Sequence, residues 1–290
     1  STDKIVAEVG ETITFSVNKT EIGTEKPIII AGPCAVYSRQ QILESAKNGK
    51  EAGIGMLRGG AYKPRTSPYS FQGLGLEALE FLAEASEITG LPFVTEVMDQ
   101  HKIEEVGNYA DVFQIGARNM QNYALLREVG QYAAEHDQGV LLKTGFLPKL
   151  KEVLCAAEYV ALEYDRVGKL PKIILCERGI NSQSNGMRNT PQPKFLLELR
   201  QATYLPVIGD PSHSSGRRDL VSQTGIRYLE AAANGLIIDT ISDTQGPQIN
   251  GIEVCDYDQG MRDSVFKGFM KEIEKLRVPQ EWPYRNIRKE

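Results

Sequence analysis

The chain has 290 residues, a formal net charge of −5, 41% hydrophobic residues and 24% charged residues, values that are ordinary for a globular protein and exclude disordered and collagen-like classes. No apolar run approaches the roughly 18 residues that a membrane-spanning helix needs, and the first residues lack the layout of a signal peptide, so we expect a cytoplasmic protein without a membrane partner. The absence of a long basic run argues against nucleic acid as a partner.

The N-terminal stretch "KIVAEVGETITFSVNKTEIG" alternates apolar and polar residues around a turn. This period of two predicts a β-hairpin. We therefore assign residues 1–26 to an N-terminal β-hairpin extension and expect it to close the bottom of the domain that follows.

Short apolar runs, each followed by a stretch of helical periodicity, recur through the rest of the chain. They occupy residues 27–34, 54–60, 91–97, 110–117, 139–145, 172–179, 205–213 and 235–240. Such runs are typical of parallel strands covered on both faces. The pattern predicts an α/β fold, a (βα)8 TIM barrel, over residues 27–290 with a C-terminal tail. An open doubly wound sheet is the alternative, but no GxGxxG fingerprint supports it.

Polar residues stand at the ends of these runs, and in a barrel the carboxyl ends of the strands meet at one mouth. Six of them are cations, which is unexpected in an acidic protein because like charges repel strongly at low dielectric. The cluster therefore indicates a site for small anions such as phosphate and carboxylate. The residues concerned are Cys34, Arg58, Lys63, Arg65, Glu96, Arg118, Lys143, Arg178, Asp210, His213 and Asp239.

The stretch "RGGAYKPRTSPYSFQGLG" follows the second run. Its glycine pair permits a tight turn, and its prolines limit the freedom of the loop that carries Lys63, Arg65 and Thr66. A loop held in this way loses less entropy when it binds a ligand. We interpret it as a preorganised anion clamp rather than a solvated loop.

Cys34, His213 and Asp239 offer a thiolate, an imidazole and a carboxylate at neighbouring strand ends. These donors are suited to a transition metal such as Mn, Fe, Co or Zn. Each residue also has a simpler interpretation, because a free cysteine after an apolar strand is more often core and a lone histidine more often a hydrogen-bonding residue. The residues alone leave both interpretations open.

The motifs "IIIAGPCAVYS", "KPRTSPYSFQG", "QIGARNMQN", "LLKTG", "CERGI" and "DPSHSSGRRDLV" occur in this order. Together they resemble the 3-deoxy-D-arabino-heptulosonate 7-phosphate (DAHP) synthases of barrel type I-beta, within the superfamily that includes the 3-deoxy-octulosonate 8-phosphate synthases. The resemblance covers nearly the whole chain, and "KPRTSPYSFQG" favours the heptulosonate branch.

The resemblance implies a transferase that condenses phosphoenolpyruvate with erythrose 4-phosphate, a homotetramer or homodimer, and a divalent metal cofactor (Mn, Co, Fe or Zn). It implies that Lys63, Glu96 and His213 are catalytic, and that Arg65 and Thr66 bind the aldehyde's phosphate. The residues implied for phosphoenolpyruvate are Arg58, Lys63, Arg118, Lys143 and Arg178.

The last strand departs from the family pattern, which has a glutamate ligand and then an aspartate ligand directly before "GPQ". Here "GLIIDTISDTQGPQ" has Asp239 in place of the glutamate and Gln245 before "GPQ". We expect Asp243 to serve as the remaining ligand, because a neutral glutamine binds such metals poorly. Smaller departures are Tyr37 and Thr144, where the family has an acidic residue and an arginine.

Two further functions are compatible with this sequence. The first is a diverged synthase that uses another aldehyde phosphate in a specialised pathway, because the altered strand borders the reacting aldehyde. The second is a catalytically silent barrel that binds anionic metabolites.

Overall fold

The structure is a computed structural model that describes residue 6, residues 11–181 and residues 187–279. Eight parallel strands pair side by side in the order β11, β8, β7, β6, β5, β4, β3 and β12. The barrel is closed because β12 also pairs with β11. The strands are β3 (Ile28–Gly32), β4 (Met56–Arg58), β5 (Phe93–Glu96), β6 (Val112–Ile115), β7 (Gly139–Lys143), β8 (Ile173–Glu177), β11 (Val207–Gly209) and β12 (Gly235–Ile241). Each falls in or overlaps a predicted apolar run, so the predicted barrel is confirmed.

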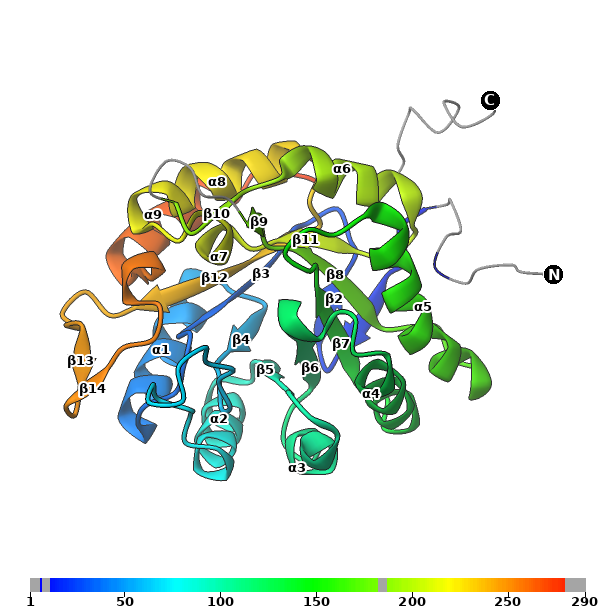
Figure 1. The fold of residues 1–290 in the computed structure, drawn as a ribbon. Helices are drawn as coiled ribbons and strands as arrows, with labels where there is room; N and C mark the ends of the chain where they lie inside the picture. Colours follow the sequence, from blue (N-terminus) through cyan, green and yellow to red (C-terminus); the bar gives the residue numbers. More distant parts are fainter. Residues whose placement is uncertain (1–5, 7–10, 182–186, 280–290) are drawn as a thin grey trace.

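Helices follow the strands and surround the barrel (Figure 1). The first, α1, begins after Ser38, whose side chain accepts a hydrogen bond from the Gln41 N–H, and ends at Gly53 with φ 90°. The polar cap and the left-handed glycine are the signals that start and stop a helix. The described helices are α1 (Arg39–Ala52), α2 (Leu76–Thr89), α3 (Ile103–Gly107), α4 (Tyr123–Glu135), α5 (Leu150–Arg166), α6 (Pro193–Ala202), α7 (Pro211–Ser215), α8 (Arg218–Glu230) and α9 (Asp263–Ile273).

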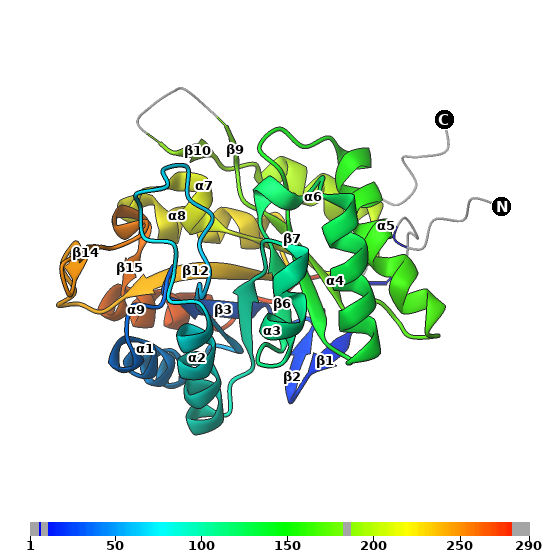
Figure 2. The same ribbon diagram turned by 60° about the horizontal axis from the view of Figure 1, so that its bottom comes forward.

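The predicted N-terminal hairpin is present as β1 (Phe15–Val17) and β2 (Thr20–Ile22). Phe15, Val17 and Ile22 are buried in the cluster that fills the barrel interior. The Thr20 hydroxyl donates to the Gly55 carbonyl, which lies just before β4. The hairpin therefore covers the end of the barrel where the strands begin, on the opposite side from their carboxyl ends (Figure 2).

The core has two parts. One cluster lies inside the barrel and the other, larger cluster lies between the strands and the surrounding helices. Because every described barrel strand is buried along its whole length, the strand ends hold their side chains on a rigid support. In the part of the chain that the structure describes, no helix has the length and hydropathy to cross a membrane.

Several short elements stand outside this regular pattern. Between β8 and α6 lie β9 (Ile180–Asn181) and β10 (Asn189–Thr190). Residues 242–260, called the 242–260 segment below, connect β12 to β15 (Met261–Arg262), which pairs with the end of β12. This segment contains the hairpin β13 (Gln248–Ile249) and β14 (Ile252–Glu253) and the 3₁₀ turn η3 (Tyr257–Gln259). The end of the predicted C-terminal tail, residues 280–290, lies outside the described residues.

Candidate active site

A cavity of about 270 Å³ opens at the carboxyl ends of the strands. The side chains that line it come from elements far apart in the chain, which is the arrangement expected for the mouth of a barrel. All seven residues predicted to bind substrate line it, together with Glu96 and His213. The seven are Arg58, Lys63, Arg65, Thr66, Arg118, Lys143 and Arg178.

Three of the cations have negative or sulfur partners in their immediate surroundings. Arg58 forms a buried ion pair with Asp239, and Lys143 forms one with Asp210 at 2.6 Å. Lys63 Nζ donates to the Cys34 carbonyl at 2.9 Å and lies 3.3 Å from Cys34 Sγ. Burial alone lowers the pKa of Arg58 and Lys63. Asp239 outweighs this effect for Arg58, and Cys34 outweighs it for Lys63, so both pKa values are raised and both side chains stay charged.

Arg118 and Arg178 differ from these cations, because the described residues provide neither with a carboxylate partner. Arg178 is buried, its Nη1 atom has no hydrogen-bond partner among the described residues, and burial lowers its pKa. Both guanidinium groups lie over the ring of Phe146, at 5.7 Å and 5.0 Å from its centroid. A buried guanidinium with an unused donor is costly unless an anion binds there. Arg178, with the exposed Arg118 beside the same ring, therefore marks the part of the cavity that is electrostatically suited to an anionic ligand.

Glu96 brings a carboxylate to the floor of this cationic cavity. It is buried at the end of β5, 3.4 Å from the amide nitrogen of Gln114. A Cβ atom at Gly116 would collide with Glu96 Oε1, so the glycine leaves room for the carboxylate in this orientation. Glu96 therefore lies where it can orient a water molecule or a substrate hydroxyl.

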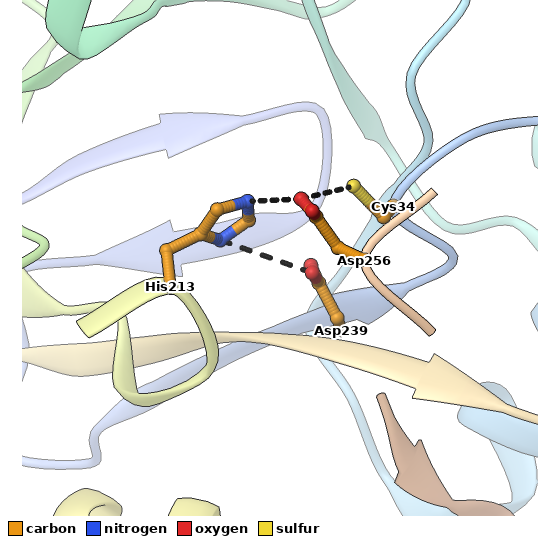
Figure 3. A group of neighbouring side chains, drawn as sticks. All are labelled: Cys34, His213, Asp239 and Asp256. Carbon is orange, nitrogen blue, oxygen red and sulfur yellow. Dashed lines mark hydrogen bonds and ion pairs between the residues drawn. The ribbon is translucent and has the colours of Figure 1, made fainter. Parts of the chain in front are cut away.

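Four metal-ligating side chains gather beside the cations: Cys34, His213, Asp239 and Asp256. Their ligand atoms all lie within 4.8 Å of one another (Figure 3). Asp256 Oδ2 is 3.3 Å from Cys34 Sγ and 3.5 Å from His213 Nε2, while Asp239 Oδ2 is 3.8 Å from His213 Nδ1. A thiol, an imidazole and two carboxylates at this spacing fit a divalent transition metal.

Asp210 orients His213 from behind. One oxygen accepts the His213 backbone N–H at 2.9 Å, and the other lies 2.9 Å from Nδ1. Burial lowers the pKa of His213, but Asp210 and then Asp239 raise it to about 9. Nε2 faces Asp256 at 3.5 Å, and because a histidine ligates a metal only when neutral, a cation bound here would displace the Nε2 proton.

The structure places Asp243, which we predicted as the fourth ligand, outside this group. Its carboxylate is exposed and accepts hydrogen bonds from Ser264 N, at 3.1 Å, and Ser264 Oγ, at 2.8 Å. Ser264 lies in the first turn of α9, where unpaired N–H groups and the helix dipole attract a carboxylate. Asp243 therefore caps a helix, and Asp256 stands with Cys34, His213 and Asp239.

The sequence analysis did not single out Asp256, Cys255, Arg188 or Gln259. Asp256 and Cys255 line the cavity, and Arg188 forms an ion pair with Asp256 at 2.7 Å. The sequence feature that could have indicated them is "VCDYDQG" at residues 254–260, in which an apolar residue is followed by potential metal ligands. The long connection from β12 concealed its proximity to His213.

Tyr37, one of the departures from the family pattern, contacts the 242–260 segment. The Tyr37 hydroxyl accepts the Cys255 backbone N–H, and the Tyr37 ring stacks on Phe71 at 4.8 Å. Cys255 Sγ in turn accepts a hydrogen bond from Arg65 and lies 3.5 Å from Cys34 Sγ. Tyr37 thus joins the 242–260 segment to the loop that carries the anion clamp. Thr144, the other departure, is buried with no partner for its hydroxyl in the described structure.

Comparison with known proteins agrees with this geometry. The sequence profile of the DAHP synthetase I family matches residues 6–275. This chain belongs to that family. It is 40% identical over 266 residues to the phospho-2-dehydro-3-deoxyheptonate aldolase of Thermotoga maritima, which covers 92% of this chain and 74% of the relative.

More distant members of the superfamily also match. A 2-dehydro-3-deoxyphosphooctonate aldolase from Paraburkholderia xenovorans is 29% identical over 250 residues, covering 76% of this chain and 82% of the relative. Among solved structures, the Thermotoga maritima DAHP synthase superposes with a TM-score of 0.82 at 40% identity, covering 91% of this chain and 73% of that one. A truncated form of the same synthase gives a TM-score of 0.80 at 38% identity, covering 91% of this chain and 92% of that one.

Proposed function

We propose that this chain condenses phosphoenolpyruvate with erythrose 4-phosphate and water to give DAHP and inorganic phosphate, the first step of the shikimate pathway. The observation that carries the proposal is one cavity lined by Arg118 and Arg178, which have no carboxylate partner among the described residues, and by His213 and Asp256 of the four-residue donor group. A doubly anionic substrate matches the first feature, and a polarised aldehyde matches the second.

Phosphoenolpyruvate carries a phosphate and a carboxylate, and the cations divide between them. Arg118 and Arg178 supply planar, multiply donating groups of the kind that bind phosphate. Lys143 and Arg58 are already paired with Asp210 and Asp239, so they are held in place before the substrate arrives. Side chains fixed in advance stabilise charge in the transition state without reorganising.

Arg65 and Thr66 bind the phosphate of erythrose 4-phosphate in this proposal. Both line the cavity, and the Thr66 hydroxyl accepts a hydrogen bond from Arg118 at 3.4 Å. This contact supports a short separation between the two phosphate sites. The aldehyde would then extend from Arg65 towards the donor group.

The reaction joins the methylene carbon of phosphoenolpyruvate to the aldehyde carbon, using the electron pair of the enol double bond. Water adds at the carbon that carries phosphate, and the bond from that carbon to the phosphate oxygen breaks to leave a ketone. Of the two protons that the water releases, one balances the proton taken up by the aldehyde oxygen and the other leaves with the phosphate. Lys63, which stays protonated, would donate a hydrogen bond to an oxygen that gains charge. Glu96 would orient the attacking water.

A divalent cation held by Cys34, His213, Asp239 and Asp256 would act as a Lewis acid that polarises the aldehyde. Mn, Co, Fe and Zn all suit this mixture of sulfur, nitrogen and oxygen donors. Metal analysis of the purified protein identifies which one it carries, and activity measured after chelation and re-addition shows whether it is required.

The direct test is incubation of the purified protein with both substrates and added Mn²⁺ or Co²⁺. We expect phosphate and heptulosonate to form in equal amounts, and only when both substrates are present. An Arg127→Met variant is the control, because Arg127 is exposed and lies over Tyr159 on α4 and α5, away from the cavity. Absence of product with every metal would refute the proposal.

A second candidate is condensation of phosphoenolpyruvate with a different aldose phosphate. The contact that favours it is the one between Arg65 and Cys255, because it brings the altered 242–260 segment directly onto the predicted phosphate clamp. A panel of three-carbon to six-carbon aldose phosphates separates the candidates. A kcat/KM that is highest for erythrose 4-phosphate supports the first, and a higher value for another aldose phosphate supports the second.

A further inference from the structure

Gln259 is a buried glutamine directly behind the metal-ligating group. Its side chain is only 2% exposed, and Nε2 donates to Asp239 Oδ2 at 2.6 Å. The other carboxylate oxygen, Oδ1, pairs with Arg58. Each oxygen of Asp239 therefore accepts from a different side chain, Oδ1 from Arg58 and Oδ2 from Gln259, which restricts rotation of the carboxylate. A carboxylate oxygen has two lone pairs, so Oδ2 can accept from Gln259 and still face a cation.

Arg188 determines which way the Gln259 amide faces. Its Nη1 donates to Gln259 Oε1 at 3.1 Å. An arginine can only donate hydrogen bonds, so the atom facing it must be the amide oxygen. The amide nitrogen is then directed at Asp239, where a donor is required. The opposite orientation would place two donors together on one side and two acceptors together on the other.

The same Nη1 atom of Arg188 pairs with Asp256 Oδ1 at 2.7 Å. The second oxygen of Asp256, Oδ2, is the one near Cys34 and His213. Arg188 thus uses one oxygen of Asp256 and leaves the other directed at the centre of the group. The hydrogen bonds run without a break from Asp256 through Arg188 and Gln259 to Asp239.

The local backbone explains why one short stretch supplies both Asp256 and Gln259. Asp256 immediately precedes the 3₁₀ turn η3, which ends at Gln259. Residues three apart in such a turn eclipse each other, so their side chains lie on the same side. Asp256 has φ 55°, a left-handed conformation that aspartate tolerates better than most residues. Arg218 stabilises the turn by donating to the Tyr257 and Gly260 carbonyls, both at 2.6 Å.

We propose that Gln259 and Arg188 are positioning residues that hold Asp239 and Asp256 in the orientation in which both ligate one divalent cation with Cys34 and His213. The inference rests on the proposed function only in taking this group to bind a divalent cation. It also explains how Asp239, one methylene shorter than the family's glutamate, is kept in place. Outer partners of this kind typically change metal affinity by about 10–100-fold when they are removed.

The test is a Gln259→Met variant, which keeps the length of the side chain and removes both hydrogen bonds. Co²⁺ binding to metal-free protein is measured by calorimetry and by the visible d–d absorption of the bound ion. We expect binding about 10–100-fold weaker than in the wild type, with a changed spectrum. The matched control is Gln248→Met, because Gln248 is exposed on the hairpin of the same segment. Equal affinity and an unchanged spectrum in Gln259→Met would overturn the proposal.

Arg188 provides an independent measurement if Gln259→Met does not fold. Arg188→Met should weaken Co²⁺ binding, and Arg188→Lys should restore part of it, since lysine retains a cationic donor. Because both residues belong to one hydrogen-bonded chain, the double variant should lose less affinity than the product of the two single losses. Additive losses, or no recovery in Arg188→Lys, would contradict the proposal.

The outcomes separate this inference from the proposed function. If the wild type binds Co²⁺ and condenses the substrates, and the Gln259→Met variant binds Co²⁺ with the same affinity and spectrum, only the positioning role is refuted. Weakened Co²⁺ binding in the variant, with no condensation by the wild type, supports the positioning role and refutes the proposed reaction. Wild-type protein that does not bind a divalent cation refutes the positioning role.

Discussion

The two halves of the cavity rim are built differently. Lys143 is the last residue of β7 and Arg178 directly follows β8, so the anion-binding half projects from buried strands. Asp256 reaches the same cavity only after the chain has left β12, formed the β13–β14 hairpin and entered a 3₁₀ turn. The barrel strands therefore fix the position of the anion-binding half. The position of Asp256 in the other half depends on side-chain contacts of the 242–260 segment. The variants below test this contrast, from the largest expected effect to the smallest.

Lys143→Met should have the largest effect on stability, because it leaves Asp210 buried without its lysine. Removing one partner of a buried ion pair costs about 3–5 kcal/mol of unfolding free energy, and we expect the lower end because His213 remains beside Asp210. Urea unfolding measures this loss of unfolding free energy. Lys102→Met is the control, because its pair with Glu105 is partly exposed and should contribute less than about 1 kcal/mol. Equal losses of unfolding free energy in both variants would mean that the Lys143–Asp210 pair contributes no more to stability than a partly exposed ion pair.

Arg178→Met should lower kcat/KM for phosphoenolpyruvate by about 10²–10³-fold, as expected for a preorganised donor to developing charge. Stability should change little or improve, since burial already disfavours the Arg178 charge and Nη1 has no partner. Steady-state kinetics and thermal unfolding distinguish the two effects. A variant that loses stability while retaining kcat/KM would show that Arg178 has a structural role instead.

Asp256→Asn and Asp243→Asn test the metal half directly. The first removes a ligand charge from the four-residue group and should weaken Co²⁺ binding by at least about 100-fold, more than the loss of an outer partner. The second keeps an oxygen that accepts from Ser264 and loses only the charge at the helix N-terminus, so it should leave Co²⁺ binding unchanged while lowering stability by about 0.3–1 kcal/mol. Calorimetric titration of both variants is the measurement. The reverse result would restore Asp243 as the ligand.

Tyr37→Phe should lower stability less than Lys143→Met does. It removes the acceptor for the Cys255 N–H and leaves that buried group unpaired, at a cost of about 1–3 kcal/mol in unfolding free energy. Tyr69→Phe is the control, because Tyr69 is 97% exposed. Thermal unfolding compares the two. Equal midpoints would indicate that the 242–260 segment is held against the clamp by its apolar contacts alone.

Much of the anion-binding half was predictable from sequence, for a physical reason. A buried parallel strand is a continuous apolar run, so its end can be located within a residue or two, and strand ends meet at one mouth. Arg58, Lys143 and Arg178 were placed correctly at the cavity by this argument alone. The N-terminal hairpin was predicted in the same way, from its period of two.

The metal half was predicted only in part. Cys34 and His213 follow strands, Asp239 lies within β12, and the three lie together as expected, whereas Asp243 lies at a helix N-terminus. In an irregular segment each carboxylate has several possible donors within reach. Spacing along the chain does not decide between a cap and a ligand.

The sequence by itself determined the eight strands, the hairpin that covers one end and the positive charge at the other, because periodicity and strand ends are local properties of the chain. Only the tertiary structure decided that Asp256, Arg188 and Gln259 lie beside Cys34, His213 and Asp239. Their placement depends on how the 242–260 segment packs against Tyr37, Arg218 and the barrel mouth. Such contacts join residues far apart in the chain, and no periodic pattern in the sequence encodes them.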